Sequence, residues 1–165
     1  MLNKWLLFIV LVVVVVALDQ ATKLYVHTNF GLYESRLVIE GFLSFTYVRN
    51  SGAAFGLLAN RDPAFLRVFF MSVTGLALVV LVFYYRRVPA GHAVTLWGLS
   101  LITSGALGNG IDRWWQGQVI DFIDVYVKDY HWPAFNIADS AIFVGAAMLL
   151  LSSFFTDDEA DKKQA

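Results

Sequence analysis

The chain has 165 residues, of which 58% are apolar and 15% are charged. Soluble globular domains average about 45 to 50% apolar and about 25% charged residues, so this composition favours a single lipid-embedded unit. The formal net charge of −1 excludes a basic nucleic-acid binder, and the absence of cysteine excludes disulfides, thiol catalysis and thiolate metal sites.

Four apolar segments have lengths near the roughly 20 residues that a membrane-spanning helix needs. They lie at about residues 4–24, 65–85, 93–112 and 137–156. These segments predict a mainly α-helical membrane protein with one four-span domain over residues 1–156. The outer segments would lie at about 25–64 and 113–136, and a polar cytoplasmic tail would follow at 157–165.

The first apolar segment allows a second interpretation, a cleaved signal peptide. Its uninterrupted apolar part, Trp5 to Leu18, has the length of a signal-peptide core; Lys4 precedes it, and Val15-Val16-Ala17 could serve as a cleavage site. Residues 19–26 can instead extend the helix by about two turns, and three further apolar segments follow. The residues alone leave both interpretations open.

The number of spans and the charge of one short loop predict the orientation in the membrane. Four spans place both termini on one side, so the two outer segments share the other side. The short loop after the second span carries Arg86 and Arg87, and Lys4 lies on the same side, which the positive-inside rule assigns to the cytoplasm. The acids that then gather near the outer face are Asp19, Asp112, Asp121 and Asp139.

The first outer segment has the pattern of two short strands followed by a loop. Arg36–Glu40 and Phe42–Val48 are rich in β-branched and aromatic residues and are separated by Gly41. The following Asn50-Ser51-Gly52-Ala53-Ala54-Phe55-Gly56 supplies turn formers and small side chains. Such residues suit a loop, or a close approach of the backbone to a ligand.

Asp121 lies in the segment Val119–Lys128, which can be tested against the two-residue period of a strand. If the segment is extended, Asp121 lies on an apolar face and Asp124 lies on the other face with Lys128. Desolvation would then raise the pKa of Asp121, whereas Asp124 would be solvated beside a cation, which favours Asp121 as the reactive acid. A helical conformation would place both acids on one face and remove this distinction.

Asp139 lies where the fourth apolar segment begins, and helical spacing puts Asn136, Asp139 and Ser140 on one face. One interpretation is structural: Asn136 caps the helix, and Asp139 reaches back to the amide of the cap. The other interpretation is functional, because a carboxylate near the top of a span is costly unless it is used. The sequence pattern is compatible with both.

Asp121 and Asp139 are the candidates for a catalytic pair. Two carboxylates in a poorly hydrated site share one proton, because both cannot readily ionise. One can then take a proton from water while the other protonates a peptide carbonyl, which is the requirement of an aspartic peptidase. His27, His92 and His131 are scattered without the spacing of metal ligands, so no metal site is predicted.

Other polar residues near the outer face have simpler interpretations. Asp112 and Arg113 would form an interfacial ion pair at the end of the third span. Asp19 and Lys23, four residues apart, suit an ion pair at a helix end. The small residues around Asn109 favour close helix packing, although Asn109 itself could position a ligand amide.

Five sequence blocks in order resemble lipoprotein signal peptidase (signal peptidase II), a family of bacterial inner-membrane aspartic peptidases. Each block alone is weak, but five blocks in order, in a chain with four predicted spans, make a specific match. The blocks are Leu18-Asp19-Gln20-Ala21-Thr22-Lys23, Asn50-Ser51-Gly52-Ala53-Ala54-Phe55, Gly105-Ala106-Leu107-Gly108-Asn109-Gly110-Ile111-Asp112-Arg113, Gly117-Gln118-Val119-Ile120-Asp121-Phe122 and Pro133-Ala134-Phe135-Asn136-Ile137-Ala138-Asp139-Ser140.

The resemblance implies that Asp121 and Asp139 are the catalytic pair. By similarity, the residues that line the site, bind the substrate backbone or support the surrounding fold are Asn50, Gly52, Asn109, Arg113, Asn136, Asp112, Asp19 and Lys23. It also implies a retained first span, a small extracytoplasmic β-sheet cradle and an outer amphipathic flap. Ser104 stands where many family members have glycine.

The activity implied by the resemblance is an intramembrane endopeptidase that removes the signal peptide from diacylglyceryl-modified prolipoproteins, cleaving before the lipidated cysteine. The expected partners are this substrate and membrane lipids, with no cofactor, metal or nucleic acid, and the enzyme is expected to be monomeric. Its expected location is the bacterial inner (cytoplasmic) membrane, with both termini cytoplasmic and the active site near the outer face.

Two other classes of membrane protein are rival interpretations. A four-span transporter would need charges at mid-span, whereas the acids of this chain are predicted near one interface. A non-catalytic membrane assembly factor would tolerate the loss of either aspartate.

Overall fold

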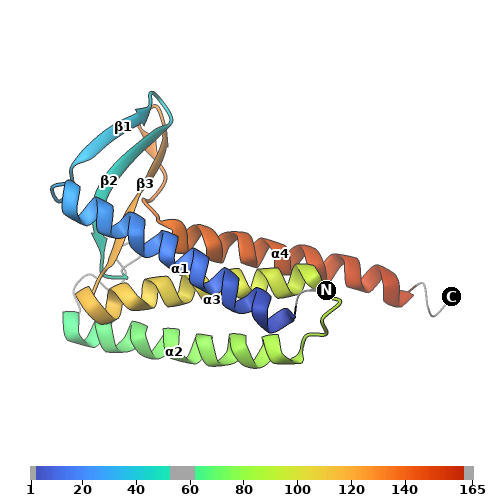
Figure 1. The fold of residues 1–165 in the computed structure, drawn as a ribbon. Coiled ribbons are helices and arrows are strands. Elements are labelled where there is room, and N and C mark those ends of the chain that lie inside the picture. The colour runs from blue at the N-terminus through green and yellow to red at the C-terminus, as the bar shows by residue number, and fades with distance from the viewer. Residues whose placement is uncertain (1–2, 53–61, 162–165) are drawn as a thin grey trace.

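The computed structural model describes residues 3–52 and 62–161, with side chains described up to residue 153, and within them it has a helical bundle and a small sheet (Figure 1). The helices are α1 (Lys4–Asn29), α2 (Pro63–Arg87), α3 (Ala93–Gln116) and α4 (Ile137–Asp161). The strands are β1 (Ser35–Ile39), β2 (Leu43–Asn50), β3 (Val119–Val127) and β4 (Tyr130–His131). Ala53 to Gly56 of the predicted loop lie outside the described residues.

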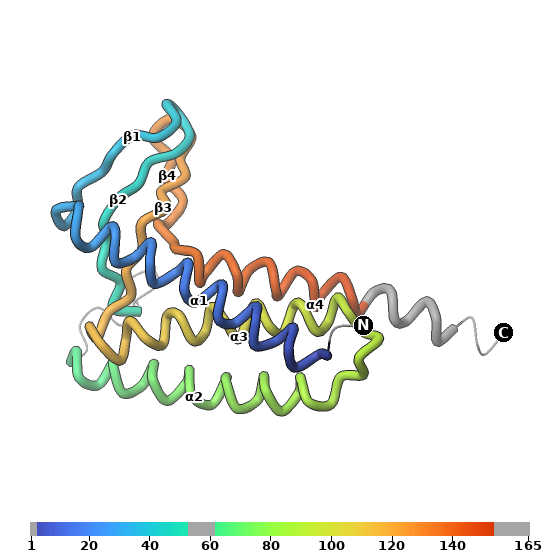
Figure 2. The backbone as a smooth tube through the Cα atoms, in the orientation of Figure 1, coloured from blue at the N-terminus to red at the C-terminus, as the bar shows by residue number. Residues whose placement is uncertain are grey.

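The sheet and the start of α1 lie at opposite ends of the bundle. In Figure 2 the helices run lengthwise beside one another, and the sheet projects from the end where α1 and α3 finish and α2 and α4 begin. The start of α1 lies at the other end, together with the connection between α2 and α3. The described parts of both predicted outer segments therefore lie at one end of the bundle, and their side of the membrane stays a prediction.

Local signals in the sequence explain where the helices begin and end. Asp62 caps α2, because its side chain accepts hydrogen bonds from the amides of Ala64 and Phe65, and Pro63 occupies the first turn. α3 ends at Gly117, whose φ of 76° is left-handed and favours glycine. Gly117 ends α3 two residues before β3 begins at Val119, so this cap directs the chain from the bundle into the sheet.

The four predicted segments are all helical, but they differ in how well they suit a membrane. α1 and α2 are long and apolar enough to cross a bilayer, whereas the apolar part of α4, Ile137–Ser153, is shorter. α1 and α2 also expose many aliphatic side chains, as helices facing lipid would. α4 continues as a helix to Asp161, so it enters the segment that we predicted as a polar tail.

α3 is the central helix and packs against α1, α2 and α4. α3 and α4 lie close together because a glycine of each helix contacts the backbone of the other. A Cβ atom on Gly98 would lie 2.9 Å from the carbonyl oxygen of Gly145, and a Cβ atom on Gly145 would lie 2.6 Å from the carbonyl oxygen of Gly98. A Cβ on Gly105 would collide with the carbonyl oxygen of Ala138. The small residues of this segment therefore form the packing face that the sequence predicted.

Gly105→Ala is expected to destabilise the fold by about 1 to 3 kcal/mol, because the added methyl group must push α3 away from α4. Its collision is with backbone, which cannot move aside like a flexible side chain. Gly75→Ala on α2 is the matched control, because nothing lies within 4 Å of a Cβ at that position. Thermal unfolding in detergent should show a lower midpoint for Gly105→Ala alone; equal midpoints for the two variants would contradict the observed packing.

The sheet is antiparallel in the order β1-β2-β3-β4, and it confirms the extended interpretation of the segment around Asp121. The first two strands form where predicted, on either side of Gly41, whose φ is 74°. β2 runs further than predicted, to Asn50, because it continues to pair with β3 as far as Val119. The sheet packs on the end of α1 through a buried cluster: Val26, Phe30, Tyr47, Ile120 and Phe122.

Candidate active site

β3 and α4 bring Asp121 and Asp139 to the same place, and Asn136 joins them. The side-chain amide of Asn136 donates a hydrogen bond of 2.7 Å to Asp121 Oδ1, and its backbone amide donates one of 3.2 Å to Asp139 Oδ2. Asn136 is fully buried, and only 2% of Asp121 is exposed. The structure thus places the two predicted acids around one asparagine, with Asp121 buried and Asp139 half-buried.

Asp139 is part of the predicted helix cap, but the cap does not account for all of its contacts. Its backbone amide donates to Asn136 Oδ1 at 2.9 Å, which completes the reciprocal pattern of a capping box. Its second carboxylate oxygen, Oδ1, accepts a hydrogen bond of 2.7 Å from the side-chain amide of Asn109 on α3. The predicted helix cap formed by Asn136 and Asp139 is therefore confirmed. The bond from Asn109 on α3 to Asp139 is not part of that cap.

Both carboxylate oxygens of Asp121 accept hydrogen bonds. Besides the bond from Asn136, Asp121 Oδ2 accepts one of 2.9 Å from the side-chain amide of Asn50 on β2. Burial raises the pKa of Asp121 to about 6, the negative charge of Asp139 acts in the same direction, and the bonds from Asn50 and Asn136 oppose the rise. Asp121 therefore holds a proton more readily than an ordinary aspartate.

Asp124 has a different environment, as the sequence predicted, but for partly different reasons. Its side chain is 14% exposed and lies 2.9 Å from Nδ1 of His131. The prediction named Lys128 as the cation near Asp124, whereas the observed partner at hydrogen-bond distance is Nδ1 of His131 on β4. The expected alternation of faces also fails at the start of β3, where four successive residues are buried.

Gly52 holds the chain just beyond Asn50 in a conformation that suits the site. Its amide donates to Asn50 Oδ1 at 2.8 Å, which leaves the amide nitrogen of Asn50 directed at Asp121. Its φ of 92° favours glycine, and a Cβ atom there would collide with the ring of Phe70 on α2. The observed close contact at Gly52 is with Phe70, and the predicted approach of this backbone to a ligand stays a prediction.

Arg113 lies half-buried beside the two aspartates. Its guanidinium lies over the ring of Phe70, 5.1 Å from the ring centroid, and its charge interacts with Asp139, Asp121 and Asp112. Among the described residues, Arg113 Nε is buried without a hydrogen-bond partner. The interpretation of Asp112 and Arg113 as an ion pair is wrong, because the observed ion-pair partner of Asp112 is Lys23.

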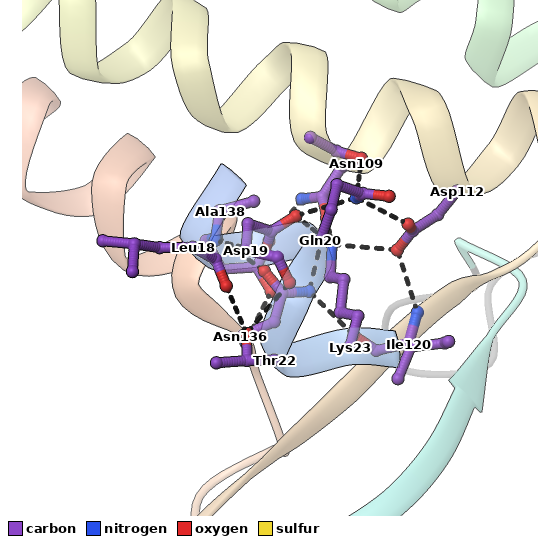
Figure 3. Close-up of polar contacts among 12 residues, drawn as sticks. Leu18, Asp19, Gln20, Thr22, Lys23, Asn109, Asp112, Ile120, Asn136 and Ala138 are labelled. Atoms are coloured by element: carbon purple, nitrogen blue, oxygen red, sulfur yellow. Dashed lines mark hydrogen bonds and ion pairs between the residues drawn. The ribbon is translucent and has the colours of Figure 1, made fainter. Parts of the chain in front are cut away.

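Lys23 is the centre of a buried polar network behind the aspartates (Figure 3). Its Nζ lies 2.8 Å from a carboxylate oxygen of Asp19 and 2.8 Å from one of Asp112, and it donates to Asn109 Oδ1 at 2.9 Å. The predicted pair between Asp19 and Lys23 is therefore present. It is not an exposed helix-end pair, because only 2% of the Lys23 side chain is exposed.

Gln20 is a member of this network that the sequence analysis did not assign. Its side-chain amide donates to Asp19 at 3.1 Å, to Asp112 at 2.9 Å and to the carbonyl oxygen of Gly108 at 3.2 Å. Its place between Asp19 and Lys23 was the only available signal, and no helical spacing distinguishes it. Gln20 therefore links α1 to α3 beside the ion pairs.

An open apolar cavity of about 470 Å³ adjoins Asp139. Its lining comes from the sheet and α4: Val125, Trp132, Phe135, Asp139, Ser140, Phe143 and Val144. Phe143 and Trp132 are largely exposed. Among the described residues, no group of three or more histidine, aspartate or glutamate side chains could hold a metal ion. The arrangement therefore combines two acids with an apolar surface.

Comparison with known proteins gives consistent matches over most of the chain. A family model described as signal peptidase (SPase) II matches residues 11–155. The lipoprotein signal peptidase of Syntrophus aciditrophicus is 47% identical over 146 residues, which cover 88% of this chain and 91% of that protein. The lipoprotein signal peptidase of Geobacter sulfurreducens is 52% identical over 132 residues, which cover 80% of this chain and 81% of that protein.

A solved structure has the same fold. It is a bacterial membrane enzyme determined by the in meso method at 2.3 Å resolution, with a TM-score of 0.82 and 35% sequence identity. The match covers 96% of this chain and 92% of that one.

Proposed function

The chain belongs to the signal peptidase II family, and from this premise we propose that Asp121 and Asp139 are the catalytic pair with which it removes signal peptides from prolipoproteins. The family makes the protein a membrane peptidase. The observation that carries the assignment of the pair is the double contact of Asn136, which donates to both carboxylates in a largely buried site. A helix cap alone would not require Asp121.

The proposed reaction needs one acid and one base. Asp139 takes a proton from water as the water oxygen attacks the scissile carbonyl carbon, and Asp121 gives its proton to the carbonyl oxygen. The tetrahedral intermediate then collapses, the carbon–nitrogen bond breaks, and the amine leaves with a proton returned through the pair. Asp121 is assigned as the acid because burial raises its pKa to about 6.

The neighbouring side chains have proposed roles that follow from their contacts. Asn50 and Asn136 orient Asp121, and Asn109 and the backbone of Asn136 orient Asp139. Among the residues that the structure describes, Arg113 Nε is a buried donor without a partner, and we assign it to a carbonyl of the substrate backbone. Gly52 keeps Asn50 in place.

The apolar cavity beside Asp139 supports a lipid-bearing substrate. Its walls of aliphatic and aromatic side chains suit the signal helix or an acyl chain better than a polar peptide. We therefore place the diacylglyceryl-modified cysteine next to this surface, with the cleaved bond immediately before that cysteine. The substrate enters from the bilayer, and the enzyme acts as a monomer without a cofactor.

The proposed topology has four spans in the bacterial inner membrane. The sheet lies near the end of the bundle opposite the start of α1 (Figure 1), and the two aspartates are on β3 and in the first turn of α4. The last turn of α2, which carries Arg86 and Arg87, lies at the same end as the start of α1, so the positive-inside rule makes that end cytoplasmic. The active site then lies near the outer face, with both termini in the cytoplasm.

The test of this function is incubation of the purified full chain with a diacylated prolipoprotein in detergent. Release of the signal peptide, detected by mass spectrometry together with a mature product that begins at the lipidated cysteine, is the expected result. A folded protein that leaves the substrate intact would contradict the proposed function. Cleavage at another bond would contradict the proposed position of the cysteine.

Asn50→Ala is expected to shift the pH dependence of cleavage to higher pH. The hydrogen bond from Asn50 stabilises the ionised form of Asp121, so its loss raises the pKa of Asp121 further above about 6. Because Asp121 acts as the acid, activity is lost as pH rises through this pKa, and the variant keeps its remaining activity to higher pH. The measurement is the pH profile of kcat/KM.

Thr46→Ala, elsewhere on β2, is the control for the Asn50 variant. Thr46 pairs with Ser35 and makes no contact with Asp121 among the interactions that determine the pKa of that carboxyl. Its profile should coincide with that of the parent. If the pH profile of kcat/KM of Asn50→Ala had its inflection at the same pH as the parent's, Asn50 would not act on the titrating acid.

A further inference from the structure

The contacts of Asn109 connect Lys23 to Asp139. Asn109 is buried, and the two ends of its side-chain amide have different partners. Its oxygen accepts a hydrogen bond of 2.9 Å from Lys23 Nζ, and its nitrogen donates one of 2.7 Å to Asp139 Oδ1. If the side-chain amide of Asn109 were turned by half a turn, its oxygen would face the carboxylate oxygen of Asp139, and its nitrogen would face the ammonium group of Lys23. The charge of Lys23 therefore selects the orientation in which Asn109 donates to Asp139.

The same ammonium group is linked to the backbone just before each aspartate. Asp19, 2.8 Å from Lys23 Nζ, accepts a hydrogen bond of 2.9 Å from the amide of Ala138, the residue before Asp139. Asp112, also 2.8 Å from Lys23 Nζ, accepts one of 3.2 Å from the amide of Ile120, the residue before Asp121. The labelled side chains of Figure 3 show this convergence from α1 and α3.

We infer that Lys23 is a positioning residue of the proposed active site. It orients Asp139 through Asn109, and through Asp19 and Asp112 it fixes the backbone just before Asp139 and Asp121. This inference rests on the proposed function. It differs from a role in stability alone, because two ion pairs with Asp19 and Asp112 would stabilise the fold without any bond to Asn109. Asn136 also donates to Asn109 Oδ1, but at 3.3 Å and without a charge.

A double-mutant cycle between Lys23 and Asn109 tests this inference. Lys23→Met keeps an unbranched side chain as far as Cε and removes the ammonium group, and it is expected to lower kcat at least about tenfold with KM changed less than about twofold. Asn109→Ala should also lower kcat. If Lys23 acts through Asn109, adding Lys23→Met to Asn109→Ala should lower kcat by no more than about twofold further.

The control is Lys4→Met, which removes the other lysine of α1. Lys4 donates to the carbonyl oxygens of Arg86 and Val88, at the end of the bundle away from the aspartates. Its kcat should stay within about twofold of the parent's, so that a loss in Lys23→Met is not a general effect of removing a lysine from this helix.

A second pair of variants covers the case in which Lys23→Met fails to fold, because that change leaves two carboxylates buried without their cation. Asp19→Asn combined with Lys23→Met removes one charge of each sign, and it is compared with Asp19→Asn alone. The expected result is a kcat at least about tenfold lower in the combined variant.

Three results would contradict the inference. The first is a double variant of Lys23 and Asn109 whose kcat falls by the product of the two single losses. The second is a Lys23→Met variant in which only KM changes. The third is an equal kcat for Asp19→Asn with and without Lys23→Met. The parent is assayed alongside: an inactive parent overturns the proposed function itself, whereas an active parent with unaffected Lys23 variants overturns only the role of Lys23.

Discussion

Asp121→Asn and Asp139→Asn are each expected to abolish cleavage of a diacylated prolipoprotein while leaving the protein folded. An amide keeps the shape of the side chain but can neither take a proton from water nor supply one to the carbonyl oxygen. General acid and base catalysis contributes about 100-fold to 10,000-fold each, so the loss in kcat should be at least about 100-fold for either variant. The measurement is turnover of the purified variants in one detergent.

Asp124→Asn is the matched control for both variants. Asp124 lies on the same strand as Asp121, but it is paired with the exposed His131 rather than with the asparagines of the site. This variant should remain active. If Asp121→Asn or Asp139→Asn kept activity within about tenfold of the parent, a difference of about 1.4 kcal/mol in the barrier, that residue would lose its catalytic role.

A prolipoprotein without diacylglycerol on its cysteine is expected to be cleaved very poorly. Each buried methylene group contributes about 0.8 kcal/mol, so acyl chains in the bilayer and against the apolar cavity can hold the scissile bond at the depth of the aspartates. Without this anchor the peptide alone must reach a site that is largely buried. We expect kcat/KM to fall at least about 100-fold, equivalent to about 2.7 kcal/mol.

The comparison requires two substrates with the same peptide sequence, one lipidated and one not, assayed in parallel in the same detergent. Competition with free diacylglycerol gives a second measurement, because it should inhibit cleavage of the lipidated substrate only. Equal rates on the two substrates would mean that the peptide sequence, not the lipid, places the bond at the aspartates.

Local patterns in the sequence predicted the elements that carry the aspartates. The alternation in Val119–Lys128 predicted a strand, and the spacing of Asn136 and Asp139 predicted a helix cap. Both predictions depend on neighbours within a few residues, which sequence spacing reports directly. Asp121 is buried and Asp124 is half-buried, but both faces of β3 are buried at its start, so the choice of Asp121 over Asp124 as the reactive acid stays a prediction.

The long-range partners could not be predicted from spacing. Asp112 was matched with its neighbour Arg113, but the end of α1 brings Lys23 to it from a distant part of the chain. Asp124 was matched with Lys128, but β4 folds back and presents His131. A partner four residues away can be read from helical geometry, whereas these contacts depend on how separate elements pack.

The number of membrane spans shows another limit of composition. The sequence predicted four spans from apolar length, but among the described helices only α1 and α2 combine the length and hydropathy of a spanning helix, and they face outward with aliphatic side chains. α3 is the central helix and contains buried serines and threonine, whose hydroxyl groups bond to carbonyl oxygens one turn earlier in the same helix. A helix surrounded by others does not need an apolar surface all round, so its hydropathy understates its depth in the bundle.

Infrared titration of the protonated-carboxyl band tests most directly whether the site holds a proton at Asp121. In the purified parent, the account predicts a band that is lost as pH rises through about 6, absent from Asp121→Asn and retained in Asp124→Asn. The account would be contradicted if the same titrating band were found in the parent and in Asp121→Asn. The band would then not come from Asp121, and the proposed pair would lack the acid that protonates the scissile carbonyl.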